Sequence, residues 1–249
     1  MYDMKGLSFR EYLKLFHNIN SDVFTIADIL NHKIKIPDLA HPLPYFRSYL
    51  ERGYYPFALD QDFSKRLEQI IVQTLESDIP QFAEMNVATG RKLKQLLAII
   101  AKSVPFKPNF SKIGELLGAS RNNIADYLIH MEEAGLISQL RNSTGGIRGL
   151  GKVEKVYLDN TNLIYLLEPD NMNIGNLRET FFYNQAKVMH NVISSSKGDF
   201  FMDGVTYEVG GKNKNQKQII NTPDSYIVRD DIEEGFNNII PLWQLGMMY

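Results

Sequence analysis

The sequence contains no cysteine, and this absence excludes disulfide bonds, thiolate zinc sites, iron–sulfur clusters and cysteine nucleophiles. It also has no apolar run long enough to cross a membrane and no basic-then-apolar secretory signal at its N-terminus. The five histidines are not spaced like the metal ligands of an HExxH motif. We therefore expect a cytoplasmic protein with no membrane partner.

The composition that remains is that of an ordinary globular protein. The 249 residues are 44% hydrophobic and 22% charged, which leaves room for more than one domain. The net charge of -2 is unevenly distributed. Residues 91–158 hold 11 Lys or Arg and 5 Asp or Glu, a balance of +6, so the rest of the chain balances to -8. A basic segment in an acidic chain indicates polyanion binding, and chance variation among solvated helices is the alternative.

The spacing of apolar and helix-breaking residues predicts an α+β multidomain protein with three regions. Residues 1–88 show helical spacing, with a break expected at Asp78-Ile79-Pro80. Residues 89–159 combine helices with two strands. Residues 160–249 alternate helical and strand patterns, and we expect an α/β domain there.

Residues 89–159 give the clearest pattern. Gly118 is a natural C-cap for the second helix of this region, and Ser120 is a natural N-cap for the third. The expected elements are helices 91–103, 111–117 and 121–134, followed by strands 136–141 and 152–158. This order is that of a winged helix-turn-helix, in which the third helix lies in the major groove of DNA.

The N-terminal end of the third helix carries side chains suited to reading base edges. Arginine pairs with guanine and asparagine with adenine, each through two hydrogen bonds. The residues at this end are Ser120, Arg121, Asn122 and Asn123. Basic residues of the preceding helix and of the wing would contact phosphates, and these are Lys112, Arg141, Arg148 and Lys152. Together they form a candidate interface with double-stranded DNA. Acidic residues on the same helix, such as Asp126, would repel the phosphates and weaken this interpretation.

A second constellation lies near the C-terminus, where two short strands are expected to meet at the Asp203-Gly204 turn. Metal-dependent nucleases use carboxylates on such strands to hold a divalent cation, and a lysine beside them orients the attacking water. The candidate ligands for Mg²⁺ or Mn²⁺ are Glu179, Asp199 and Glu208, and the candidate catalytic residues are Asp199, Glu208 and Lys212. The alternative is a solvated hairpin with ordinary surface charges.

Six segments follow one another in an informative order. They are Gly6-Leu7-Ser8-Phe9-Arg10-Glu11-Tyr12-Leu13, Tyr49-Leu50-Glu51-Arg52-Gly53-Tyr54-Tyr55-Pro56, Asp78-Ile79-Pro80, Lys155-Val156-Tyr157-Leu158-Asp159, Gly175-Asn176-Leu177-Arg178-Glu179 and Glu208-Val209-Gly210-Gly211-Lys212. In this order they resemble a family of prokaryotic AAA-type ATPases whose C-terminal half is a domain of unknown function. The resemblance spans essentially the whole chain.

The resemblance implies a helical lid-like region at residues 1–88, a winged helix at 89–159 and a restriction-endonuclease-like, PD-(D/E)XK-like α/β core at 160–249. It also implies a P-loop ATPase domain before Met1, so that ATP would bind only in that domain or chain. The sequence would then be the C-terminal portion of a longer protein, and a homo-oligomer is one assembly it could form.

The chain departs from the nuclease pattern at one position. That pattern has a lysine two residues after the second acid, on the same face of the strand. Here Gly210 stands at that position, and the next lysine is Lys212. Our leading hypothesis is therefore a DNA-binding and regulatory module with a degenerate nuclease-like core. An active divalent-metal-dependent endonuclease and a protein-interaction module without nucleic-acid binding are the alternatives.

Overall fold

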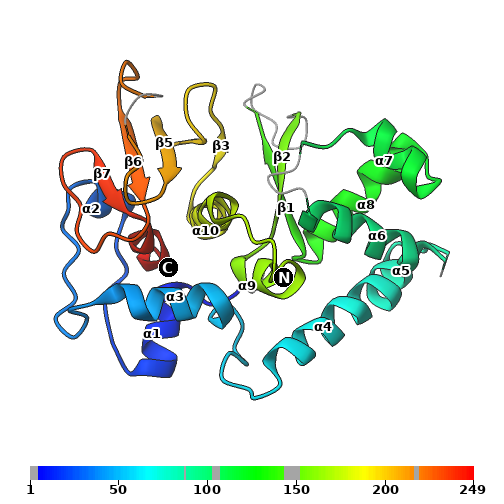
Figure 1. Ribbon diagram of the computed structural model, residues 1–249, viewed down its shortest axis with the longest axis horizontal. Coiled ribbons are helices and arrows are strands. Elements are labelled where there is room, and N and C mark those ends of the chain that lie inside the picture. Colours follow the sequence, from blue (N-terminus) through cyan, green and yellow to red (C-terminus); the bar gives the residue numbers. More distant parts are fainter. Residues whose placement is uncertain (1–4, 87, 103–106, 143–151, 216–218) are drawn as a thin grey trace. The chain divides into compact units, whose positions relative to one another are not determined.

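A computed structural model of the protein describes residues 5–86, 88–102, 107–142, 152–215 and 219–249 (Figure 1). These residues form helices together with a two-stranded and a five-stranded sheet, which confirms the α+β class. They divide into two compact units. Unit 1 joins the described residues up to Ala58 to Ile174–Tyr249, and unit 2 is Leu59–Asn173.

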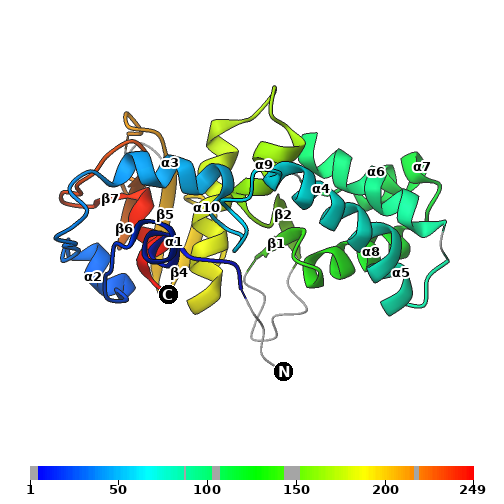
Figure 2. The ribbon, with the colours of Figure 1, turned by 90° about the horizontal axis from the view of Figure 1, so that it is seen from below.

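Unit 1 is built on the five-stranded sheet, whose strand order is β3-β4-β5-β6-β7. Strands β3, β4 and β5 pair antiparallel, whereas β5, β6 and β7 pair parallel. Helix α10 lies against the sheet at β5 (Figure 2). The elements of unit 1 are α1 (Phe9–His17), α2 (Ile26–Leu30), α3 (Pro42–Arg52), α10 (Ile174–Met189), β3 (Ile193–Ser194), β4 (Phe200–Met202), β5 (Val205–Gly210), β6 (Ser225–Arg229), β7 (Ile239–Pro241) and the 3-10 helix η3 (Leu242–Met247).

An aromatic cluster holds the first and last parts of the chain together in unit 1. Phe9 of α1 packs edge-on against Phe46 of α3 at 5.4 Å between ring centroids, and Phe46 packs against Phe181 of α10 at 4.8 Å. Trp243 of η3 closes the cluster at 6.4 Å from Phe9. Helix α1 begins where it does because Ser8 forms a capping box with Glu11. The cap thus sets Phe9 at the first position of the helix, facing the cluster.

Unit 2 contains helices and the two-stranded sheet. The elements are α4 (Phe63–Gln73), a π-helix η1 (Thr74–Asp78), α5 (Ile79–Phe82), α6 (Thr89–Lys102), α7 (Phe110–Leu117), α8 (Arg121–Glu133), β1 (Ile137–Arg141), β2 (Val153–Leu158) and α9 (Thr161–Leu167). Helix α8 packs on α7 and on β1, and α6 packs on β2. The antiparallel pair β1–β2 begins with Ile137 opposite Leu158.

The turn between α7 and α8 follows from its sequence. Gly118 adopts a left-handed conformation with φ of 56°, which favours glycine, and ends α7. Ser120 then caps α8, because its hydroxyl accepts a hydrogen bond from the backbone N–H of Asn123 at 3.1 Å. Helix α8 buries Ile124 and Leu128 completely. The two helices therefore meet across the tight turn that the sequence predicts.

The regions 1–88, 89–159 and 160–249 stay a prediction. The two compact units group the chain in another way, because the aromatic cluster packs the N-terminal helices against α10 and η3. The helix break expected at Asp78-Ile79-Pro80 does not occur. The chain instead forms a π-helical turn up to Asp78 and continues into α5, with Pro80 in the first turn, where a missing N–H is tolerated.

The described part of the chain has no helix with the length and apolar character that crossing a bilayer requires.

The hydroxyl of Tyr207 provides a test of the core of unit 1. It is buried on β5 with no hydrogen-bond partner among the described residues. Tyr207→Phe should therefore leave the free energy of unfolding at pH 7 unchanged or raise it. Burial raises the pKa of Tyr207 above its ordinary value. The unfolded chain consequently ionises first as the pH rises above about 10, and the folded state loses stability there. Denaturant unfolding at pH 7 and at a pH above about 10 should show that the free energy of unfolding falls less in the variant than in the unsubstituted protein.

Tyr49→Phe is the matched control. The Tyr49 hydroxyl donates to the carbonyl of Leu7 at 2.7 Å and accepts from Nε2 of Gln185 at 3.1 Å. Its removal should cost about 1–2 kcal/mol at pH 7. An equal cost for Tyr207→Phe would contradict the unpartnered state of that hydroxyl.

Candidate functional site

A groove in unit 2 brings together three of the basic residues predicted to contact DNA. Arg121 is the first residue of α8, Arg141 the last of β1, and Lys152 directly precedes β2. All three line one groove of about 700 Å³. Phe110 of α7 and Ile129 of α8 give the groove apolar surface as well. The fold thus gathers cations that are separated by up to thirty-one positions in sequence.

The other predicted interface residues lie at the turn or on its flanks. Lys112 is exposed on α7, and Asn122 is exposed in the first turn of α8. Ser120 and Asn123 are tied to each other, because the Ser120 hydroxyl also donates to Oδ1 of Asn123 at 2.9 Å. Arg148 lies outside the described residues. All four described residues of this set are exposed, and Ser120 and Asn123 are held by the cap of α8 whereas Lys112 and Asn122 are not part of it.

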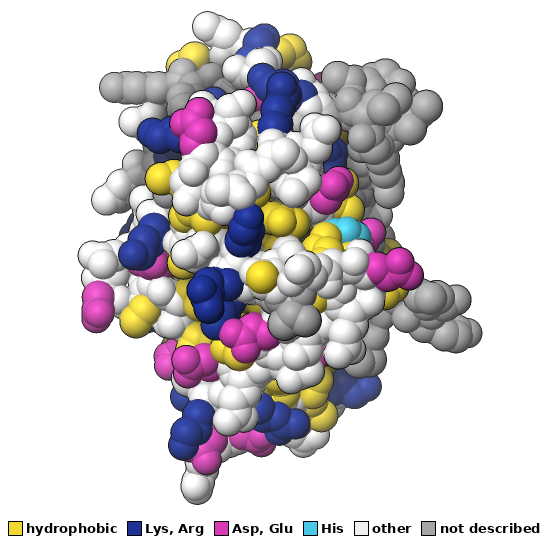
Figure 3. Space-filling view, turned by 90° about the vertical axis from the view of Figure 1, so that its right-hand side faces the viewer, with side chains coloured by type: hydrophobic (Ala, Val, Ile, Leu, Met, Phe, Trp, Pro, Cys, Tyr) yellow, Lys and Arg dark blue, Asp and Glu magenta, His cyan; other side chains and the backbone are white. Residues whose placement is uncertain are grey.

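Two of the groove's three cations already face carboxylates. Arg141 lies 3.7 Å from Glu132, and Lys152 lies 3.5 Å from Glu154. No ion pair to Arg121 is found within the described part of the chain. In Figure 3, Lys and Arg side chains are interspersed with acidic and uncharged ones and do not form one continuous basic surface. An incoming polyanion would therefore meet Arg121 unpaired and would compete with acidic neighbours for the other two.

Glu208 occupies the centre of the second predicted constellation. It lies on β5 opposite Ile227 of β6, and only 1% of its surface is exposed. One carboxylate oxygen forms an ion pair with Nζ of Lys214. The other oxygen, Oε2, is buried without a hydrogen-bond partner among the described residues. A buried carboxylate of this kind depends strongly on its single cation.

Lys214, rather than the predicted Lys212, is the lysine that reaches Glu208. Strand β5 ends at Gly210, and Lys212 lies exposed in the turn that follows. A Cβ atom on Gly210 would stand 2.5–2.7 Å from three side-chain carbons of Lys214. The glycine at the position of the expected lysine therefore leaves the space through which Lys214 folds back.

The remaining predicted metal ligands do not complete a metal site. Asp199 directly precedes β4, and its Oδ2 accepts a hydrogen bond from the backbone N–H of Val209 at 2.9 Å. Glu179 is half-buried on α10. Within the residues that the structure describes, no group of three or more His, Asp or Glu side chains could hold a metal ion. Glu179, Asp199 and Glu208 are therefore not brought together as one ligand set.

Other contacts fix the segment that carries Lys214. Arg229, the last residue of β6, donates from Nε to the carbonyl of Lys214 at 3.0 Å. Arg178 of α10 pairs with Asp230 at 2.9 Å, and the backbone N–H of Asp230 donates to the carbonyl of Gly210 at 2.9 Å. These partners are far apart in sequence, so no local pattern could have identified them.

Comparison with known proteins places the groove within a family domain. Residues 43–173 match the family model described as Domain of unknown function (DUF8612), and this is more than half of the chain. The chain belongs to the DUF8612 family. The match covers most of α3 and all of unit 2, so it includes the groove and excludes the Glu208–Lys214 pair. No curated protein and no solved structure matches the chain.

The two lysines after β5 give a matched test of the buried pair. Lys214→Met should lower the free energy of unfolding by about 3 kcal/mol, because it leaves the Glu208 carboxylate buried without a cation. Lys212→Met, in the exposed turn, should change it by less than about 0.5 kcal/mol. Adding Glu208→Gln to Lys214→Met should recover part of the loss. Equal effects of the two single lysine variants, measured by urea unfolding, would refute the assignment.

Proposed function

We propose that this DUF8612 chain is a DNA-binding and regulatory module associated with an AAA-type ATPase, and that residues 89–159 act as its winged helix. The observation that supports the proposal most directly is the convergence of Arg121, Arg141 and Lys152, from three elements, on one groove. In this assignment α8 is the helix that enters the major groove, and the β1–β2 hairpin is the wing.

The chemistry of each part follows from its position. Arg121 and Asn122 are exposed in the first turn of α8, where a reading helix contacts base edges, and their side chains pair with guanine and adenine. Arg141 and Lys152, at the neighbouring ends of β1 and β2, contact phosphates and fix the orientation of the duplex. Because Glu132 and Glu154 compete for these two cations, binding is moderate and strongly dependent on salt.

The C-terminal part of unit 1 is, in the same proposal, a degenerate restriction-endonuclease-like core. Its mixed sheet carries Glu208 on the central strand β5, as the resemblance implies for an acid of the nuclease motif. Lys214 neutralises this acid, and Gly210 stands where the motif has lysine. The core then serves as a scaffold, and its expected partner is the ATPase domain or chain.

Substitutions in the groove test DNA binding. Arg121→Gln combined with Lys152→Gln should weaken binding to a short duplex by about 10- to 100-fold, since one base contact and one phosphate contact are lost. The slope of log K against log salt should become shallower by about 1–2. Fluorescence anisotropy between about 50 and 200 mM salt measures both quantities.

A charge-matched control separates the groove from general electrostatics. Lys14 of α1 and Lys65 of α4 are exposed and do not line the groove. Their double replacement by glutamine makes the same change in net charge and should leave affinity and slope nearly unchanged. Binding that is insensitive to salt and to the groove variants would contradict the proposal. A stable oligomer that binds no nucleic acid would favour the protein-interaction module instead.

An active endonuclease is the second candidate, and the contact between Glu208 and Lys214 favours it. That contact supplies an acid and a lysine side by side, although from a different spacing than the nuclease motif. Our proposal predicts that the chain leaves supercoiled plasmid intact with Mg²⁺ or Mn²⁺, because the described residues lack a metal-holding group. Plasmid nicking that disappears in Glu208→Gln but persists in Lys212→Met would establish cleavage and overturn the degenerate core.

A further inference from the structure

The groove beside α8 also has an apolar part, which the duplex contacts proposed above do not use. Arg121, Ala125 and Ile129 line the groove at intervals of four residues, so they form one stripe along about two turns of the helix. Ile129 is 43% exposed, and Val153 at the start of β2 is half-buried. The groove is therefore cationic at the first turn of α8 and apolar further along the helix.

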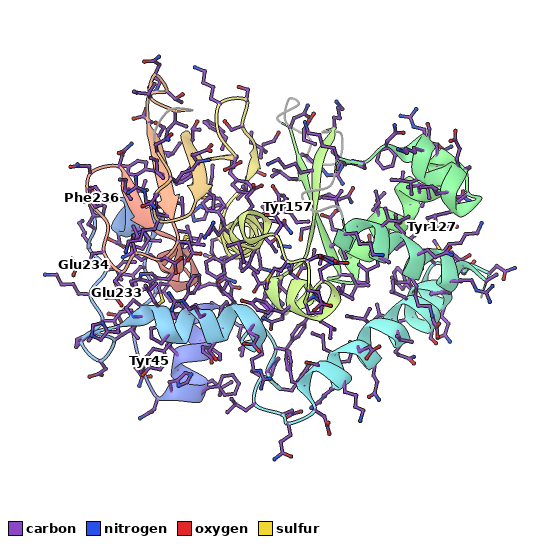
Figure 4. The ribbon with its side chains drawn as sticks, viewed as in Figure 1. Tyr45, Tyr127, Tyr157, Glu233, Glu234 and Phe236 are labelled. Carbon is purple, nitrogen blue, oxygen red and sulfur yellow. The ribbon has the colours of Figure 1, made fainter. Side chains whose placement is uncertain are left out.

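Phe110 supplies an aromatic ring to this groove. Asn109 caps α7, because its Oδ1 accepts a hydrogen bond from the backbone N–H of Lys112 at 3.1 Å, and Phe110 is therefore the first residue of the helix. Phe110 is half-buried, and its ring packs on no other aromatic ring among the described residues. Tyr127 of α8 and Tyr157 of β2, which are labelled in Figure 4, are buried. Phe110 is thus the aromatic side chain that the described lining of the groove offers to a ligand.

The charges that line the groove are of one sign. None of its described lining residues is acidic, and Glu132 and Glu154, which face Arg141 and Lys152, lie outside that lining. Glu132 is also shared, since its Oε2 accepts a hydrogen bond from Nε2 of Gln139 at 2.8 Å. Cations and an aromatic ring in one groove favour an anionic ligand that has a flat apolar face.

An unpaired nucleotide fits this chemistry better than a base-paired one. In a duplex the bases are stacked on each other, and a protein reaches only their edges and the phosphates. An unpaired strand offers phosphates and free base faces, and proteins bind it with cations along the backbone and aromatic rings under the bases. The groove has both groups, and its volume of about 700 Å³ is within the range of pockets that enclose organic ligands.

We propose that the groove beside α8 binds unpaired nucleotides that continue from a duplex, so that the preferred ligand of unit 2 is DNA with a single-stranded extension. One base stacks on Phe110 and packs against Ile129, while Arg141 and Lys152 hold the phosphates of the same strand. This inference rests on the proposed function, because the duplex at the exposed first turn of α8 positions the strand that enters the groove.

Three ligands test the inference on the unsubstituted full chain by fluorescence anisotropy at one salt concentration. They are a blunt duplex, the same duplex with an extension of about eight thymidines, and the same extension made of abasic nucleotides, which keep the phosphates and lack the bases. The thymidine extension, tested at the 3′ and at the 5′ end, should at one end bind at least about fivefold more tightly than the other two ligands.

The outcomes separate this inference from the proposed function. Equal binding of the thymidine and abasic extensions would show that charge alone is recognised, and equal binding of the extended and blunt duplexes would show that the groove takes no unpaired strand. Either result overturns the inference and leaves duplex binding in place. Absence of binding for all three ligands would overturn both.

Substitutions of phenylalanine locate the stacked base. Phe110→Leu keeps an apolar side chain without a stacking face, so the ratio of affinities for the thymidine and abasic extensions should fall to about one. Phe110→Trp keeps a stacking face and should keep the ratio. Phe82→Leu is the matched control, because Phe82 of α5 is 80% exposed and lies outside the groove. A ratio that Phe110→Leu leaves unchanged, or that Phe82→Leu lowers equally, would overturn the placement of the base on Phe110.

Discussion

The packing of Phe9, Phe46 and Phe181 is the constraint on which the organisation of the chain depends. These rings are almost completely buried, and they join two helices near the start of the sequence, α1 and α3, to α10, which begins at Ile174. Because these rings pack together, the first and last parts of the chain form one unit, and residues 59–173, which lie between those parts in the sequence, form the other. The DUF8612 match covers all of that second unit, which is consistent with a domain that carries its own core.

The charged side chains of the two candidate sites have different kinds of partner, and the different roles that we propose for the two units rest on this difference. In unit 1 the Glu208 carboxylate is held inside the protein by Lys214, so the charge is neutralised internally. In unit 2 Arg121 is exposed at a helix N-terminus, and the nearby Arg141 and Lys152 each pair with a partly exposed carboxylate. Surface pairs of this kind contribute little to stability and can be exchanged for phosphate contacts. Binding is therefore proposed for unit 2 and a scaffold role for the core of unit 1.

Helix caps could be predicted from the sequence, whereas side-chain contacts that depend on the folded path of the chain could not. The ends of α7 and α8 follow from Gly118 and Ser120, because a left-handed cap and an N-cap act within a few residues. The contact of Lys214 with Glu208 depends on how the chain turns after β5, and the strand pattern indicated Lys212 instead. The unpartnered hydroxyl of Tyr207 had no signal in the sequence, since its state is defined by what surrounds it in the folded chain.

The central claim is that unit 2 binds duplex DNA at the groove beside α8. Hydrogen–deuterium exchange of the full chain, with and without a saturating duplex, tests it most directly because it reports the contacted segments without any substitution. Our account predicts slower exchange in the first turns of α8, at the end of β1 and at the start of β2 when DNA is present. Protection confined to unit 1, or no change in these three segments at a DNA concentration that saturates binding, would contradict it.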